Sequence, residues 1–397
     1  MLSPLLRSVR LARRIPPNRC WAHEYERGLP PNHSPNQARG RRAGWACLAV
    51  VGPLFAHGRK RAHMRGSTPT QFFLVAVIAL MTLAIPAGAE QCTIPAVGYR
   101  VMHIGGRVVA VWYPTRAAAR QHAYGPTFSS VLALNAPPST ACGRPVPLVV
   151  FSHGDLGCGL QSVVFTEQLA RSGYVVAAPD HADATLCHTV PPQSGLIAQV
   201  PPQPNIFAPD AWDDTTRTDR RQDLEAVIDT LLGDGEFRKV IDAERIGAAG
   251  HSLGGYTVVG LAGGWQTWLD RRIRAVLAFS PYVMPFQAKQ TIGEVKVPLM
   301  YQGGTEDVGI TPFLQGPKGA YAQAHRPAYF LVLRNAAHFA WVNCGNEHTT
   351  ASCFAKVTNQ RLMTEYGIAF FDLYLKGIQE PLLRQQNPAL ASYEFRQ

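Results

Sequence analysis

Short, continuous apolar runs alternate with amphipathic segments from about residue 107 to residue 377. Apolar runs of this kind are typical of parallel strands that are buried on both faces of a sheet. The pattern predicts strands over residues 107–114, 148–151, 174–180, 245–249, 275–279, 297–301 and 329–333.

Apolar residues at helical spacing predict helices between these strands. In residues 219–232, one face is formed by Leu224, Val227, Ile228 and Leu231. Further helices are predicted over residues 162–171, 256–262 and 364–375. Strands that alternate with helices indicate an α/β fold with a doubly wound, mostly parallel sheet and helices on both faces.

Two segments interrupt this alternation and are expected to be irregular. Residues 115–147, with their Ala, Pro and Ser, are predicted to form a surface connection. Residues 191–209 are crowded with Pro and Gln, which cannot sustain regular structure, and are predicted to form a lid-like excursion near the functional site.

The net charge of +11 would suggest a nucleic-acid partner if it were spread over the folded part. Residues 1–66 hold 13 Lys and Arg against 2 Asp and Glu, and residues 67–89 hold none. Residues 90–397 therefore carry 25 basic and 25 acidic side chains. We expect this neutral part to form one large domain that binds no nucleic acid.

Residues 64–89 have the pattern of a secretory signal. Arg65 precedes an apolar run over residues 72–85, and Ala87-Gly88-Ala89 supplies small residues before a cut at Glu90. The alternative is a membrane anchor, but the run is shorter than the roughly 20 residues of a span. We therefore expect an exported protein with no membrane span after cleavage. Residues 1–63 are an Arg- and Pro-rich leader, disordered or not translated if Met64 is the true start.

Six cysteines follow the predicted cut, and an even number in an exported chain predicts disulfides. The two nearest in sequence, Cys344 and Cys353, are expected to pair and to help hold the loop that carries His338. Elimination leaves the pairs Cys158–Cys187 and Cys92–Cys142. No C-x-x-C spacing indicates a zinc site.

The sequence Gly250-His251-Ser252-Leu253-Gly254 stands between a predicted strand and a predicted helix. A G-x-S-x-G turn in this context is the nucleophile elbow, whose glycines permit a sharp bend that exposes the serine. The alternative is a glycine-rich turn with no chemical role. The context favours Ser252 as a nucleophile.

A carboxylate and a histidine follow later strands in the order that a Ser, acid, His triad requires. Asp307 lies in the loop after residues 297–301, with Glu306 as the alternative acid. His338 lies after residues 329–333 and would act as general base. Taken separately, these residues could be solvated charges and a structural histidine. Their joint order favours a triad.

Two backbone N–H groups are predicted to stabilise an oxyanion, those of Leu253 and Asp155. The Asp155 carboxylate must then point away or be paired. No metal spacing is present among His153, His181, His188, Asp180 and Asp183, so neither a metal nor another cofactor is expected. The indoles of Trp265, Trp268 and Trp341 either line a substrate cleft or pack in the core.

Five segments carry a resemblance to a known family: Val111-Trp112-Tyr113-Pro114, Phe151-Ser152-His153-Gly154, residues 173–181, residues 250–255 and Ala337-His338-Phe339. They resemble exported α/β-hydrolases described as predicted dienelactone hydrolases, which are similar to platelet-activating-factor acetylhydrolases and, more distantly, to cutinase-like polyesterases. The resemblance implies an α/β-hydrolase fold and a serine esterase with Ser252, Asp307 and His338 as its triad and Asp155 as an oxyanion donor.

The chain departs from those relatives at two positions. True dienelactone hydrolases use a cysteine nucleophile where this chain has Ser252, and the acetylhydrolases usually have an apolar residue where Asp155 stands. The leading hypothesis is an exported hydrolase of small-molecule carboxylic esters that works through an acyl-serine intermediate without a cofactor. The alternatives are an interfacial lipase or polyesterase and a hydrolase-fold binding protein without turnover.

Overall fold

The computed structural model describes residues 94, 96–125, 128–184 and 203–397. The predicted leader over residues 1–63 and the predicted signal over residues 64–89 lie outside these ranges. Residues 191–202 of the predicted lid-like excursion, together with Cys92, Cys187 and His188, also lie outside them.

A single sheet of eleven strands runs through the described part of the chain, in the order β11-β10-β9-β8-β7-β5-β6-β2-β1-β4-β3. The strands are β1 (Ala96–Ile104), β2 (Arg107–Thr115), β3 (Arg120–Ala123), β4 (Ser129–Leu134), β5 (Val146–Ser152), β6 (Val175–Pro179), β7 (Ile241–His251), β8 (Ile273–Phe279), β9 (Leu299–Gly304), β10 (Ala328–Leu333) and β11 (Leu390–Arg396).

The centre of the sheet is parallel, from β6 through β5, β7, β8 and β9 to β10. Antiparallel strands flank it, with β2 and β1 beyond β6 and with β11 beyond β10. Each strand predicted from an apolar run corresponds to one strand of this sheet. The predicted doubly wound, mostly parallel sheet is therefore confirmed.

One prediction was wrong: residues 115–147 are not only a surface connection. They contain β3 and β4, which pair antiparallel, and β4 also pairs with β1. The sequence hides β3 because its four residues, Arg-Gln-His-Ala, are mostly exposed and form no apolar run. β4 has buried and exposed positions in irregular alternation.

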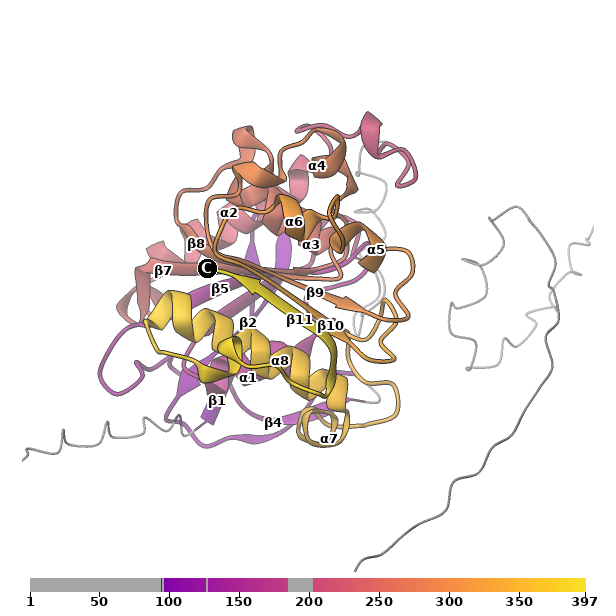
Figure 1. Ribbon diagram of the computed structural model, residues 1–397. Helices are drawn as coiled ribbons and strands as arrows, with labels where there is room; N and C mark the ends of the chain where they lie inside the picture. The colour runs from indigo at the N-terminus through magenta and orange to yellow at the C-terminus, as the bar shows by residue number, and fades with distance from the viewer. Residues whose placement is uncertain (1–93, 95, 126–127, 185–202) are drawn as a thin grey trace, which may run out of the picture. The chain divides into compact units, whose positions relative to one another are not determined.

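Helices cover both faces of the sheet (Figure 1). On one face lie α1 (Val163–Arg171) and α8 (Thr358–Phe371), and on the other lie α2 (Thr218–Gly233) and α3 (Leu253–Val259). Shorter helices are α4 (Met284–Ala288), α5 (Thr311–Leu314), α6 (Ala320–Gln323) and α7 (Thr350–Lys356).

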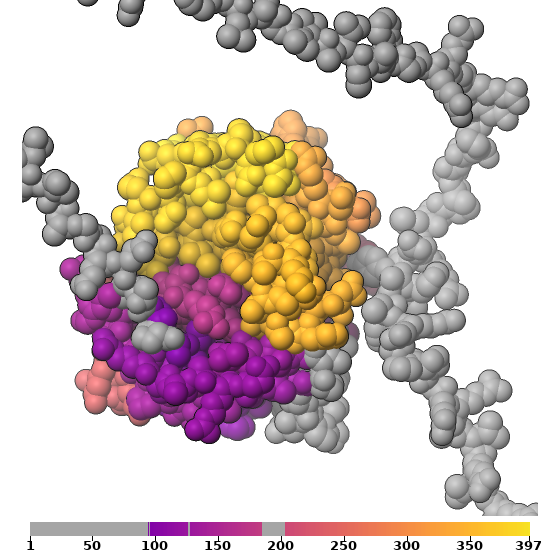
Figure 2. Space-filling model, turned by 90° about the horizontal axis from the view of Figure 1, so that it is seen from below, coloured from indigo at the N-terminus to yellow at the C-terminus, as the bar shows by residue number. Residues whose placement is uncertain are grey.

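The core has two halves because successive strand residues face opposite sides of the sheet. In β5, Leu148 and Val150 pack with α2 and α3, whereas Val149 and Phe151 pack with α1 and α8. All four side chains are buried. On the α8 side, residues from the beginning and from the end of the described chain lie next to each other (Figure 2).

The predicted disulfide between Cys344 and Cys353 is present and joins the loop after β10 to α7, with 6.0 Å between the two Cα atoms. A bridge that closes so short a loop is expected to contribute about 2 to 3 kcal/mol to the free energy of unfolding. Cys142 and Cys158 are disulfide-bonded as well. Their predicted partners, Cys92 and Cys187, lie outside the described residues.

Among the helices that the structure describes, none combines the length and the hydropathy needed to cross a membrane.

Candidate active site

Five neighbouring strands each place a polar residue just beyond their carboxyl ends. Asp155 follows β5, Ser252 follows β7, Ser280 follows β8, Asp307 follows β9 and His338 follows β10. These strands are adjacent and parallel, so their carboxyl ends share one edge of the sheet, where open α/β sheets bind ligands. The predicted site residues therefore lie at the same edge.

Ser252 stands in a strained backbone conformation between β7 and α3, with φ 56° and ψ −116°. A non-glycine residue in this region is uncommon and costs free energy, which fits a turn that must present its side chain. The turn also requires glycine at position 254, because a Cβ there would collide with the carbonyl oxygen of Ser152. Close packing of the turn against β5 therefore sustains the conformation of Ser252.

A hydrogen-bonded array runs from Ser252 through His338 to Asp307. The Oγ of Ser252 lies 2.9 Å from Nε2 of His338, and Nδ1 of His338 lies 3.2 Å and 3.3 Å from the two carboxylate oxygens of Asp307. The Asp307 side chain is 2% exposed and the His338 side chain is 28% exposed. Glu306, the alternative acid, is exposed, so it is Asp307 that contacts the histidine.

Ser280 joins this array, and the sequence analysis did not single it out. Its hydroxyl donates a hydrogen bond to the Asp307 carboxylate, and its Oγ also lies 2.8 Å from Nδ1 of His338. Since the hydroxyl proton is used on Asp307, the Nδ1–H of the histidine donates to Ser280 as well as to Asp307. Ser280 therefore helps to hold the tautomer in which Nε2 carries no proton and can accept a hydrogen bond from the Ser252 hydroxyl.

His251, the residue before the predicted nucleophile, links the histidine loop to the loop after β5. Its Nε2–H donates to the carbonyl oxygen of His338 at 2.8 Å, and its Nδ1 accepts from the Gln161 amide at 2.9 Å. The other end of Gln161 accepts from the N–H of Gly154 at 3.0 Å. Burial, followed by the nearby charge of His338, lowers the pKa of His251 to about 3. The ring is therefore neutral, as one donor and one acceptor require.

The two residues predicted to supply oxyanion donors are Leu253, directly after Ser252, and Asp155, in the loop after β5. Leu253 is the first residue of α3, where an N–H has no acceptor within the helix. Asp155 follows Gly154, and a Cβ on Gly154 would lie 3.4 Å from Cβ of Ser252. The Asp155 carboxylate is paired, as expected, with Nη2 of Arg217 at 3.2 Å.

The other strand-end histidines are buried in a network of hydrogen bonds. His181 contacts Ser152 through Nε2 and Asp223 through Nδ1, each at 2.8 Å. Burial and then Arg220 lower the pKa of His181 well below its usual range, so the ring is neutral. No group of three potential metal ligands occurs in the described ranges.

The three tryptophans belong to the core rather than to an open cleft. Trp265 is 7% exposed, Trp268 is 2% exposed, and Trp341 is fully buried. The indole of Trp265 donates to the Tyr256 hydroxyl, and that of Trp341 donates to Gln302. All three tryptophans therefore pack in the core, which is the second of the two predicted possibilities.

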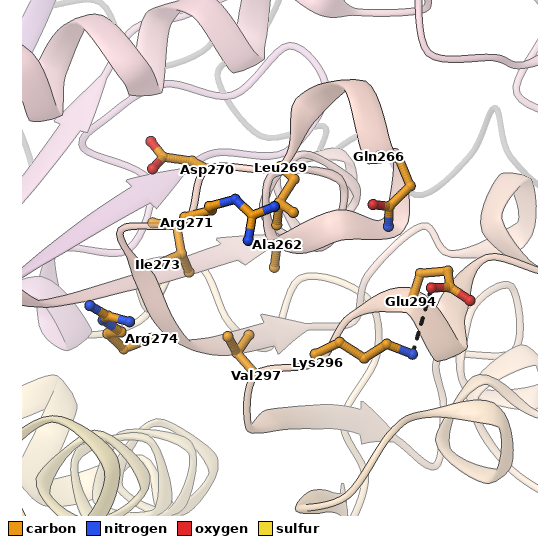
Figure 3. Close-up of a pocket in the computed structure, with 10 residues that line it drawn as sticks. All are labelled: Ala262, Gln266, Leu269, Asp270, Arg271, Ile273, Arg274, Glu294, Lys296 and Val297. Atoms are coloured by element: carbon orange, nitrogen blue, oxygen red, sulfur yellow. Dashed lines mark ion pairs between the residues drawn. The ribbon is translucent and has the colours of Figure 1, made fainter.

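A surface groove of about 490 Å³ is lined by none of the residues of this site. Figure 3 shows the residues that line it. Its lining includes Asp270, Arg271, Ile273 and Lys296, and Lys296 forms an ion pair with Glu294. Ile273 begins β8, whereas Ser280 follows the end of that strand. A strand of this length separates the two by about 20 Å. The groove therefore lies near the opposite edge of the sheet.

Parts of this chain are similar in sequence to known proteins. The family model of platelet-activating factor acetylhydrolase, isoform II, matches residues 122–226. Lipase 1 of Moraxella sp. (strain TA144) is 25% identical over 184 residues, which cover 45% of this chain and 50% of the lipase. The chain thus spans about half the length of that relative.

Among solved structures, a ferulic acid esterase from Streptomyces cinnamoneus matches with a TM-score of 0.55 and 20% identity, over 79% of this chain and 99% of the esterase. At this identity the likeness bears on the fold alone. Together with the strand order and the elbow after β7, it defines the class: the chain has an α/β-hydrolase fold. Within that class the chain resembles acetylhydrolases of platelet-activating factor, as its motifs indicate.

Proposed function

We propose that this chain is a serine-dependent carboxylic-ester hydrolase that acts through an acyl-Ser252 intermediate. The observation that carries the proposal is the 2.9 Å contact between Oγ of Ser252 and Nε2 of His338, with Nδ1 of the same ring held by Asp307 and Ser280. This arrangement provides a nucleophile, a base within hydrogen-bond reach and a group that orients the base. The names of the similar lipase and esterase support the same substrate class.

In the proposed reaction, Ser252 Oγ attacks the ester carbonyl carbon while its proton passes to Nε2 of His338. The N–H groups of Leu253 and Asp155 stabilise the resulting oxyanion. The intermediate collapses, the C–O bond to the alcohol breaks, and His338 returns the proton to the leaving alkoxide. Water then attacks the acyl-serine by the same route, releasing the acid and restoring Ser252.

A panel of p-nitrophenyl esters from acetate to palmitate, assayed on protein that begins at Glu90, tests this proposal. We expect hydrolysis of part of the panel and covalent labelling of Ser252 by a fluorophosphonate, because both reactions need an activated serine. Hydrolysis of emulsified long-chain triglyceride would instead indicate the interfacial lipase. A folded protein that neither turns over the esters nor reacts with the probe would support the binding-protein alternative.

We also propose that the protein is exported after cleavage before Glu90. The signal pattern in residues 64–89 supports this, and so do the disulfide between Cys344 and Cys353 and the disulfide-bonded state of Cys142 and Cys158, since disulfides persist mainly in oxidising compartments. Amino-terminal sequencing of the protein recovered from its exporting host is expected to begin at Glu90. A soluble, active product that retains Met1 would overturn this proposal.

A further inference from the structure

Arg220 of α2 is a fully buried cation that contacts the loop after β5, residues 153–157, here called the oxyanion loop. Its Nη1 donates to the carbonyl oxygen of His153 at 2.7 Å, and its Nη2 donates to that of Gly154 at 3.1 Å. Nη2 also reaches both oxygens of Asp183, at 2.7 Å and 2.9 Å. A buried guanidinium is costly unless such partners offset its desolvation, so the loop and this cation fix each other in place.

The carbonyl of Gly154 determines where the N–H of Asp155 points, because both belong to one planar trans peptide group. That carbonyl accepts from Arg220, from Nδ1 of His153 at 2.7 Å and from the N–H of Gly157 at 3.1 Å. The Asp155 N–H therefore points to the side opposite Arg220. Gly154 itself lies against Ser252. Arg220 thus orients the peptide group that carries the predicted oxyanion donor.

Arg217, at the start of α2, acts on the side chain of the same residue. Its Nη2 lies 3.2 Å from the Asp155 carboxylate, and its Nη1 lies 3.2 Å from that of Asp183. Burial by itself would raise the pKa of Asp183, but several neighbouring groups, with Arg220 first among them, together outweigh burial and hold this pKa well below its usual range. Asp183 is therefore an anion that connects the two arginines.

The pairing of Asp155 has a chemical purpose if the loop stabilises an oxyanion. A carboxylate near a developing negative charge raises the energy of the transition state, and a neighbouring cation offsets that effect. The Asp155 side chain is 43% exposed, whereas that of Arg217 is 13% exposed. The more buried partner is the cation, and its second contact, with Asp183, holds it beside the Asp155 carboxylate.

We propose that Arg220 and Arg217 are positioning residues for the oxyanion loop: Arg220 orients the Asp155 N–H, and Arg217 neutralises the Asp155 carboxylate. The inference rests on the proposed esterase function and extends it.

The test is a rescue experiment. Arg217→Gln is expected to lower kcat about tenfold, or about 1.4 kcal/mol, with little change in KM, because an unpaired carboxylate opposes the transition state more than the bound ester. Asp155→Leu keeps the backbone N–H and removes the carboxylate that Arg217 is proposed to neutralise. Combined with Arg217→Gln, it should restore most of the lost activity.

Arg221→Gln is the matched control, because Arg221 lies on the same helix and pairs with Glu225 on the helix surface. We expect it to retain wild-type kcat. A wild-type kcat in Arg217→Gln, or a loss that Asp155→Leu does not rescue, would overturn the proposal for Arg217. Labelling of wild-type Ser252 by the fluorophosphonate separates these results from a failure of the esterase function itself.

Arg220→Lys tests the other half of the proposal. Lysine keeps the charge but lacks the planar guanidinium that binds two carbonyl oxygens and a carboxylate at the same time. We expect kcat to fall about a hundredfold, the cost of losing one oxyanion donor, with the circular dichroism spectrum unchanged. A folded Arg220→Lys variant with wild-type kcat would refute the role of Arg220. If the variant does not fold, Arg220→Gln, which keeps one donor group, serves as the second variant. Failure of both variants to fold would show that Arg220 stabilises the fold, and it would overturn its proposed role in positioning the oxyanion loop.

Discussion

Replacing Ser252 by alanine is expected to reduce kcat by about 10⁴- to 10⁶-fold, a loss comparable to that expected for His338→Ala. In the proposed mechanism the variant lacks the atom that forms the acyl bond, so only the proposed oxyanion donors and substrate binding would still contribute to catalysis. The measurement is kcat on the best ester of the p-nitrophenyl panel, together with fluorophosphonate labelling, which should disappear.

The fold should survive this substitution. Alanine can adopt the φ of 56° about as well as serine does. Within the described residues, the Ser252 hydroxyl forms a hydrogen bond only with His338, so its loss removes little stabilisation. Ser392→Ala, on the edge strand β11, is the control and should keep full activity. If Ser252→Ala retained more than a few per cent of the wild-type rate, another group would be the nucleophile.

The parallel centre of the sheet was predictable because each of its strands is buried on both faces and leaves a continuous apolar run. In β5, β6 and β9 every residue is buried, which explains why their sequences are almost entirely apolar. Edge strands carry no such signal. β3 is largely exposed and β11 alternates irregularly, and both are held by pairing with a neighbouring strand rather than by an apolar sequence of their own.

The same distinction applies to the candidate site. Ser252 lies in a motif whose second glycine, Gly254, is required by the close approach of β5. His338 and Asp307 follow strand ends in a recognisable order. Ser280 has no motif. Its relevance comes only from the position of β8 between β7 and β9, which brings the end of that strand beside the histidine and the acid.

The role of Arg220 could not be predicted from the sequence for a similar reason. In sequence it is one of several charges at the start of an amphipathic helix, where a solvated position is the ordinary expectation. In the structure it is fully buried beneath the oxyanion loop. Gln161 and His251 likewise connect the oxyanion loop to the histidine loop through contacts between segments that are about ninety residues apart. Such contacts depend on the completed fold.

His338→Ala and Asp307→Asn are expected to differ in size. Removing the histidine would eliminate the proposed general base, and kcat should fall about 10⁶-fold. Asp307→Asn keeps the shape of the side chain but not its charge, so the imidazolium loses stabilisation and kcat should fall about 10⁴-fold. Both values are measured at saturating ester, with Tm as the check on folding.

Glu306→Gln is the matched control for the acid, because Glu306 precedes Asp307 and is exposed. We expect it to retain wild-type activity. Ser280 bears on the size of the Asp307→Asn effect, since its hydroxyl lies 2.8 Å from Nδ1 of His338 and still accepts from that nitrogen when the carboxylate is gone. The Asp307→Asn loss should therefore deepen when Ser280→Ala is added. If Glu306→Gln lost most of its kcat while Asp307→Asn kept nearly wild-type kcat, Glu306 rather than Asp307 would be the acid of the triad.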